Sequence, residues 1–258
     1  MIANYHTHTY RCSHATGNDE EYIKRAIDGG IKILGFSDHA PFPLCKDKNN
    51  CWWRIQVEDA EEYVSSIKAL REKYRDEITI YIGFEMEYYP KYFKEMLNYV
   101  KSLGAEYLIM GQHYYAGEEN GEASHSAGSF HDEKQLTVYT DIVIEGMRTG
   151  KYSYVAHPDM LKYSGDKSHY EKEAKRLCEA SLKLDIPLEL NLLGIFGNRH
   201  YPNEAFLEVA GQVGCKMIFG FDAHDPQRAY DEKSLVKAQA LVEKYNINLI
   251  DTINLKKP

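Results

Sequence analysis

The sequence lacks an apolar run long enough to cross a membrane, since no stretch approaches the roughly eighteen apolar residues that a spanning helix needs. Its first residues, Met-Ile-Ala-Asn-Tyr-His-Thr-His, also lack the apolar segment of a secretion signal. We therefore expect no membrane partner, no secretion and a cytoplasmic location.

Cysteine is scarce and shows no paired pattern. The chain has five cysteines, an odd number, and no two of them form a CxxC pair. This pattern is typical of free thiols in a reducing compartment, and it disfavours a cysteine-based zinc site. We expect these side chains to serve in packing. They are Cys12, Cys45, Cys51, Cys178 and Cys215.

Positively charged residues are fewer than negatively charged ones. Lysine and arginine number 31 against 39 aspartates and glutamates, which gives a net charge of −8. Because proteins that bind nucleic acid usually present a basic face, we expect no nucleic-acid partner. A small cationic pocket is still compatible with this charge.

No linker rich in proline, glycine or serine divides the chain. Instead, short apolar runs with β propensity alternate seven times with segments of helical spacing. This alternation predicts parallel strands joined by crossover helices in one closed or nearly closed α/β barrel, a single domain over residues 1–258. The predicted strands are Ile2–Tyr5, Ile33–Ser37, Ile78–Phe84, Tyr107–Gly111, Tyr154–Ala156, Pro187–Asn191 and Met217–Gly220.

The segments between these runs carry helix signals. Asn18 is a suitable N-cap for a first helix that ends at Gly29, and the last predicted helix runs from about Asp231 to Tyr245. Two connections, Ala40–Cys51 and Tyr114–Asp132, are longer than ordinary βα connections. We predict functional loops there.

Every predicted strand carries polar side chains at or just after its carboxyl end, most of them of the metal-ligand type. In a βα barrel, functional groups gather at this end of the strands, so we expect these side chains to lie close together. In strand order they are His6 and His8, Asp38 and His39, Glu85 and Glu87, His113, His157, Glu189 and Asn191, and Asp222 and His224.

These ligand types predict a metal centre. Imidazoles and carboxylates suit Zn, Mn or Fe where thiolates are absent. His6 and His8 are two residues apart on an extended strand, so their side chains point the same way and can bind one ion. We favour Glu85 over Glu87 as a bridging ligand, because Glu85 stands closer to the end of its apolar run. Since most ions take three or four protein ligands, this many ligands predicts three ions.

Three other histidines are not predicted to bind metal. His125 lies in a stretch that reads as a mobile loop. His131 and His169 lie near predicted helix starts, where surface or capping roles are expected.

The ordered motifs HTH, SDHAP, GFEMEY, GQHY, VAHPD, ELN and FGFDAH resemble those of the PHP family, the polymerase and histidinol phosphatase superfamily, over essentially the whole chain. The resemblance implies a distorted (β/α)7 TIM-like barrel with three divalent ions at the carboxyl ends of the strands. The implied ligands are His6, His8, Glu85 and Asp222 for one ion, Glu85, His113 and His157 for a second, and His14, His39 and His224 for a third.

His14 is a candidate ligand through the resemblance alone. Asn4 is one departure from the family, which often has aspartate at this place. Because Asn4 is not an expected ligand, we expect this departure to change contacts around the ligands rather than to cause the loss of an ion.

Within this family the chain resembles the stand-alone histidinol phosphatases most, by its length, its ELN strand followed by an arginine-bearing loop, and its WWRI segment. The resemblance implies hydrolysis of a small phosphomonoester, L-histidinol phosphate, to L-histidinol and phosphate in histidine biosynthesis. A hydroxide that bridges two ions would form near neutral pH, because bound metal lowers the pKa of water.

Side chains outside the ligand set are predicted to bind the substrate. Arg199 is the first candidate for a phosphate contact, since a planar guanidinium binds phosphate in a bidentate manner. Arg54 is a second candidate, although a surface arginine at a helix start is an equal interpretation. His200 is predicted to protonate the leaving group, a role that Asp222 or a metal-bound water could also serve.

Three other functions stay open. A PHP phosphoesterase that acts on nucleotides or oligonucleotide ends would share the metals and add base stacking, which 21 tyrosines allow. An amidohydrolase-like enzyme would polarise a carbonyl with one or two ions. A non-enzymatic metal scaffold is disfavoured because no member of the ligand set is missing. The native metal and the oligomeric state are left open.

Overall fold

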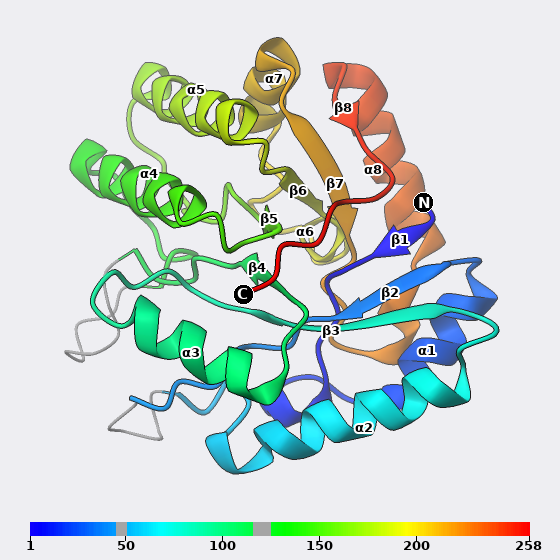
Figure 1. Cartoon of the computed structure of the whole chain (residues 1–258). Helices are drawn as coiled ribbons and strands as arrows, with labels where there is room; N and C mark the ends of the chain where they lie inside the picture. The colour runs from blue at the N-terminus through cyan, green and yellow to red at the C-terminus, as the bar shows by residue number, and fades with distance from the viewer. Residues whose placement is uncertain (45–50, 116–124) are drawn as a thin grey trace.

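The computed structural model describes residues 1–44, 51–115 and 125–258. Its strands form one sheet in the order β1 to β8, and each neighbouring pair is parallel. Figure 1 shows the sheet curling round with the long helices on its outer face. The strands are β1 (Ala3–Asn4), β2 (Ile33–Phe36), β3 (Thr79–Glu85), β4 (Tyr107–Met110), β5 (Tyr154–Val155), β6 (Leu188–Asn191), β7 (Lys216–Gly220) and β8 (Asn248–Leu249).

The barrel closes where the chain beyond β1 meets the chain beyond β7. Thr7 forms a parallel bridge with Ala223, and the His8 N–H donates to the Ala223 carbonyl at 3.0 Å. β8 pairs instead with the first residues of β7, Lys216 and Met217. The predicted distorted barrel is confirmed. Its eighth strand has no counterpart among the predicted strands.

The helices follow the predicted order, with one addition. Asn18 accepts a hydrogen bond from the Glu21 N–H while the Glu21 carboxylate accepts from the Asn18 N–H, which confirms the first N-cap. The short α6, which was not predicted, begins at Leu192 directly after β6, with Asn191 as its N-cap. The helices are α1 (Asp19–Asp28), α2 (Ala60–Lys73), α3 (Phe93–Leu103), α4 (Glu133–Arg148), α5 (Lys167–Leu184), α6 (Leu192–Phe196), α7 (Glu204–Val213) and α8 (Glu232–Tyr245).

The amino end of the barrel is filled by a small apolar cluster. Tyr5, Tyr107 and Tyr154 lie buried there, and Ile253 and Leu255 of the C-terminal segment pack against them. Figure 1 shows this segment running across the barrel to the C-terminus. The amino end of the barrel is therefore occupied by side chains that hold the fold together.

The thiols differ in one respect from the prediction. Cys12, Cys178 and Cys215 are free and buried, as packing residues should be. Cys51 is disulfide-bonded, so the prediction of free thiols is wrong for this residue. Cys45 lies outside the described residues. The predicted cytoplasmic location, which rested partly on free thiols, stays a prediction.

Parts of the two long predicted loops lie outside the described residues. These are residues 45–50 of the first loop and 116–124 of the second. Within the three described ranges, no helix combines the length and the apolar character that a bilayer span requires.

Candidate metal centre

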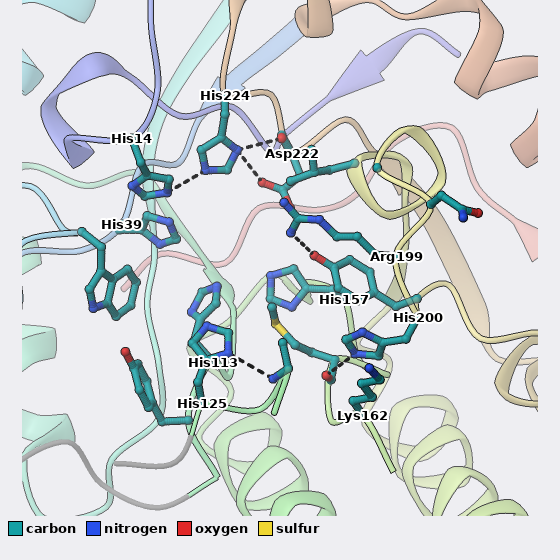
Figure 2. A pocket seen from close by; sticks show the side chains of 18 of the residues that line it. His14, His39, His113, His125, His157, Lys162, Arg199, His200, Asp222 and His224 are labelled. Carbon is teal, nitrogen blue, oxygen red and sulfur yellow. Dashed lines mark hydrogen bonds and ion pairs between the residues drawn. The ribbon is translucent and has the colours of Figure 1, made fainter. Parts of the chain in front are cut away.

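A cavity of about 760 Å³ lies at the carboxyl ends of the strands (Figure 2). Its lining includes six of the nine predicted ligands: His14, His39, His113, His157, Asp222 and His224. The other three, His6, His8 and Glu85, are buried and contact members of this set. The structure thus brings all nine predicted side chains into one cluster.

One carboxylate oxygen of Glu85 faces three histidines. Glu85 Oε2 lies 3.1 Å from His39 Nδ1, 3.5 Å from His6 Nε2 and 3.6 Å from His8 Nε2. These nitrogens come from the ends of β1 and β2, which are neighbours in the sheet. The geometry provides one corner at which several imidazoles can share a cation with Glu85.

The second oxygen of Glu85 faces a different pair of histidines. Glu85 Oε1 lies 2.8 Å from His157 Nε2 and 3.5 Å from His113 Nε2. A Cβ atom at Gly111 would overlap the Glu85 carboxylate, so glycine is required at this position. Because its two oxygens face different ligand groups, Glu85 has the geometry of a bridging carboxylate.

Asp222 completes the first group. Its Oδ1 lies 3.1 Å from His8 Nε2, 3.5 Å from His6 Nε2 and 3.3 Å from His224 Nδ1. The backbone of Asp222 has a φ of 50°, in the left-handed region that residues other than glycine rarely adopt. Such strain is typical of functional positions, where the surrounding structure holds a side chain in a required direction.

His14 and His224 form a pair within the cluster. His14 Nδ1 donates to the Cys12 carbonyl at 2.7 Å and His224 Nδ1 to the Asp222 carbonyl at 3.0 Å. Burial lowers the pKa of both imidazoles, so both are neutral at neutral pH. Each Nε2 then carries a lone pair, and the two Nε2 atoms lie 3.0 Å apart. A cation between them would relieve the repulsion of these lone pairs.

Unpaired buried atoms show that the cluster suits metal ions. Within the described chain, four atoms of the cluster that face one another have no hydrogen-bond partner: His6 Nε2, His8 Nε2, His39 Nδ1 and Glu85 Oε2. An unpaired buried polar atom costs about 1–3 kcal/mol. Groups of three side chains whose ligand atoms lie within 4.8 Å include His6, His8 and Asp222; His6, Glu85 and His157; and His8, His39 and His224. The residues therefore fit divalent metal ions.

A second layer of carboxylates fixes three of the imidazoles, a role that the sequence analysis did not assign. Each of these carboxylates accepts from an Nδ1 atom, which leaves Nε2 directed at the cluster. The pairs are His6 with Glu189 (2.8 Å), His8 with Asp38 (3.2 Å) and His113 with Glu87 (2.5 Å). The sequence signal was present, since Asp38 and Glu87 follow predicted strands and Glu189 lies near the end of one.

Glu189 links two strands of the candidate site. Besides His6, it accepts hydrogen bonds from the His157 N–H at 3.0 Å and from Asn191 Nδ2 at 2.8 Å. A Cβ atom at Gly220 would overlap its carboxylate. Glu189 thus positions candidate ligands that lie more than a hundred residues apart in the sequence.

The charges in the cluster attract a cation. Burial by itself would raise the pKa of the Glu85 and Asp222 carboxyl groups, but neighbouring imidazoles hold both pKa values well below the ordinary range. Burial would lower the pKa of His6, yet Glu189, Asp222 and Glu85 raise this pKa well above the ordinary value. Buried carboxylates that stay ionised draw positive charge, whether from protons or from metal ions.

Asn4 acts beside the ligands. Its Nδ2 donates to Thr7 Oγ1 at 2.9 Å and to the His6 carbonyl at 3.3 Å, and its Oδ1 accepts from the Phe221 N–H at 3.0 Å. An ionised aspartate has no donor and could not make the first two contacts. Asn4 therefore ties the first strand to the seventh, which fits the expected change beside the ligands.

The structure does not place Arg54 in the cavity. Its side chain is fully buried, and Nη1 donates to Glu87 Oε2 at 2.5 Å. Arg54 also lies under the ring of Trp53, with 4.0 Å between the guanidinium carbon and the ring centroid. A guanidinium that is buried against a carboxylate is not available to a phosphate. Both predicted interpretations of Arg54, a substrate contact and a surface side chain, are therefore replaced by a support for Glu87.

Arg199 and His200 do line the cavity, together with Lys162, which the sequence analysis missed. Arg199 Nη1 donates to the Tyr201 hydroxyl at 2.6 Å. His200 Nε2 donates to the Met160 carbonyl at 2.7 Å, and burial lowers the pKa of this imidazole. The single N–H of neutral His200 is thus engaged, so its contact suits loop positioning better than the predicted proton transfer.

Aromatic residues form another part of the lining. Trp52, Trp53 and Tyr114 line the cavity, and so does His125, which had been expected only as a loop residue. The sequence analysis gave these residues no site role, because nothing in their local pattern shows which loops meet across a barrel.

Two histidines lie elsewhere, as predicted. His131 Nδ1 contacts Ser164 Oγ at 2.8 Å, and His169 Nε2 contacts Thr137 Oγ1 at 3.1 Å. Neither residue lines the cavity.

Comparison with known proteins identifies related chains. The "Probable histidinol-phosphatase" of Deinococcus radiodurans is 27% identical over 233 residues, which cover 87% of this chain and 87% of the relative. The "Histidinol-phosphatase" of Bacillus subtilis is 21% identical over 252 residues, which cover 85% of this chain and 92% of the relative.

A solved structure shares the fold. It is the histidinol phosphate phosphatase of Lactococcus lactis in complex with zinc, L-histidinol and phosphate. The superposition gives a TM-score of 0.74 at 18% identity and covers 98% of this chain and 97% of the other. The model of the family described as PHP domain matches residues 4–192. Because this match covers more than half of the chain, the protein belongs to the PHP domain family.

Proposed function

We propose that this chain is a metal-dependent phosphatase that hydrolyses L-histidinol phosphate to L-histidinol and phosphate. The observation that carries the proposal is one cavity whose lining combines metal-type ligands with two cationic side chains, Arg199 and Lys162; among these ligands, His39 Nδ1 has no hydrogen-bond partner in the described chain. The names of the relatives support the choice of substrate, as does the fold shared with an enzyme whose structure holds zinc, L-histidinol and phosphate.

The proposal includes three divalent ions, of Zn, Mn or Fe. The residues that would hold them are His6, His8, Glu85 and Asp222 for the first, Glu85, His113 and His157 for the second, and His14, His39 and His224 for the third. The two-sided contacts of Glu85 support its double role. When bound, such ions neutralise phosphoryl oxygens and lower the pKa of water, which makes a nucleophile available near neutral pH.

The phosphoryl group would lie against Arg199 and Lys162. A guanidinium can donate two parallel hydrogen bonds to phosphate oxygens, and an ammonium adds charge without that geometry. The Tyr201 hydroxyl holds one nitrogen of Arg199, which restricts the side chain to the cavity. We assign His200 to holding this loop through Met160.

A phosphoesterase that acts on mononucleotides is the alternative. The aromatic part of the cavity lining favours it, because an indole stacks on a nucleobase as it does on an imidazole. The two functions differ in the leaving group and share the metal centre and the phosphate contacts.

A phosphate-release screen of L-histidinol phosphate, mononucleotides and sugar phosphates tests the proposal, with metal content measured in parallel. We expect kcat/KM for L-histidinol phosphate to exceed that for mononucleotides by at least ~100-fold, about 2.7 kcal/mol of transition-state discrimination. Comparable kcat/KM values for mononucleotides would instead support the alternative function, a phosphoesterase that acts on mononucleotides. Elemental analysis that finds one ion or none, in protein prepared without chelators, would reject the three-ion centre.

A further inference from the structure

The cavity has two walls of different chemistry. Figure 2 shows Arg199 and Lys162 on one side, and His14 on the opposite side. Trp52 belongs to the side of His14, since the two rings lie 6.2 Å apart with an interplanar angle of 73°. One wall is therefore cationic, and the other wall is aromatic.

The two tryptophans of the aromatic wall are in different states. Trp53 is packed, with its ring centroid 4.7 Å from that of His39 and its face over Arg54. Trp52 is 55% exposed, which leaves much of a large apolar surface in water. Exposed aromatic surface at the mouth of a cavity is typical of a binding residue. Trp53 thus supports the wall, while Trp52 offers a surface to a ligand.

The charges of the lining limit what this wall can recognise. Among the described residues that line the cavity, the one carboxylate is Asp222, which belongs to the candidate ligands. Within the described ranges, the aromatic wall therefore offers an incoming group no carboxylate of its own. An indole binds planar rings by stacking and cations through its π face. An imidazole ring can stack on the indole, and in its protonated form it is also a cation.

We propose that Trp52 determines specificity for the leaving group, with its indole stacked on the imidazole ring of the ester while the phosphoryl group lies against Arg199 and Lys162. This inference rests on the proposed function and adds the part of the site that selects the alcohol. The cavity volume of about 760 Å³ accommodates a small ester.

Tryptophan fluorescence gives a test that does not depend on turnover. The chain has two tryptophans, and both line this cavity. In the metal-loaded Trp53→Phe variant, Trp52 is the single source of this emission. Titration with L-histidinol should quench the emission to saturation, whereas alaninol, which keeps the amino alcohol and lacks the ring, should leave it unchanged. Equal responses to both compounds, or none to L-histidinol, would overturn the inference.

Kinetics on a matched pair of esters give the second test. Trp52→Ala should lower kcat/KM for L-histidinol phosphate about 10-fold, the size of one stacked ring, and should change kcat/KM for alaninol phosphate less than about 2-fold. Trp52→Phe should recover part of the loss. Metal content should stay unchanged, which excludes an effect through His14. Leu182→Ala, at another exposed apolar side chain on α5, serves as the control.

The outcomes separate the two proposals. If the wild-type enzyme does not hydrolyse L-histidinol phosphate, the proposed function fails. If it does, but Trp52→Ala lowers kcat/KM equally for both esters or for neither, the inference about Trp52 fails and the proposed function stands. If Trp52→Ala lowers kcat/KM for mononucleotides more than for L-histidinol phosphate, Trp52 stacks on a nucleobase. This result would also overturn the inference about Trp52.

Discussion

The two ends of the barrel are built from the same strands and bury opposite chemistry. At the amino end, the Tyr107 hydroxyl donates to the Tyr5 carbonyl at 2.8 Å, and Ile253 packs over this apolar cluster. At the carboxyl end, His6 Nε2 and Glu85 Oε2 are buried without a hydrogen-bond partner in the described chain. Satisfied polar groups stabilise a fold, whereas unpaired ones cost free energy and persist where a ligand uses them.

Two residues at the carboxyl end also have unusual backbone conformations. His157 and Asp222, both at the carboxyl end, have φ values of 30° and 50°. These conformations are costly for residues other than glycine. The carboxyl end thus carries both backbone strain and unpaired atoms, and we expect substitutions there to change metal binding and activity more than stability.

The largest effect should come from Glu85→Gln. The amide keeps the shape and loses the charge that faces ligands on both sides, so more than one ion should be lost. We expect kcat/KM to fall more than about 10³-fold. Elemental analysis and kinetics measure the result, with Glu61→Gln on the exposed face of α2 as control. Loss of a single ion would show that Glu85 does not bridge two ions.

The next effect should come from Arg199→Ala, which removes a charged contact to the phosphoryl group. We expect kcat/KM to fall roughly 10²-fold with metal content and fold unchanged. Arg199→Lys should recover part of the loss, because an ammonium keeps the positive charge and lacks the bidentate geometry of the guanidinium. Arg148→Ala, at an exposed arginine at the end of α4, is the control. Near-normal kinetics in the alanine variant would show that metals alone bind the phosphate.

A smaller effect is expected from Glu189→Gln, which weakens the support of His6 and His157. Such changes beside a metal typically cost about 10–100-fold in metal affinity or activity. Competition with a chelator measures the affinity, and thermal unfolding of metal-free protein tests the fold. Glu208→Gln on α7 is a matched exposed control. Unchanged affinity would mean that the backbone alone orients these ligands.

The smallest effect on activity should come from the amino end. Ile253→Ala removes part of the side chain that covers the tyrosine cluster, and should lower the free energy of unfolding by about 1–2 kcal/mol. We expect kcat/KM and metal content to stay within about 2-fold of wild type. Urea denaturation measures stability, and Val236→Ala at an exposed position is the control. A loss of metal in the folded variant would show that the two ends are coupled.

Local patterns were sufficient to predict most of the elements. The period of apolar residues and the cap at Asn18 anticipate the first helix, and the seven apolar runs match β1 to β7 within a few residues. Two short elements, α6 and β8, were not predicted.

The partners of charged side chains could not be predicted in the same way. Arg54 follows the first long loop, and its local sequence is compatible with an exposed position. Its burial depends on Glu87, more than thirty residues away, which in turn binds His113. Such chains of contacts arise from packing between different strands and leave no period in the sequence.

By itself, the sequence determined the order of strands and the carboxyl-end position of the histidines and carboxylates, because alternation and apolar period are local properties of the chain. The tertiary structure alone decided that Glu189, Asp38 and Glu87 fix the imidazoles, and that Lys162 and Trp52 join the cavity. The physical reason is that closure of the barrel brings together loops that are far apart in the chain, and these contacts depend on the packing of the whole sheet.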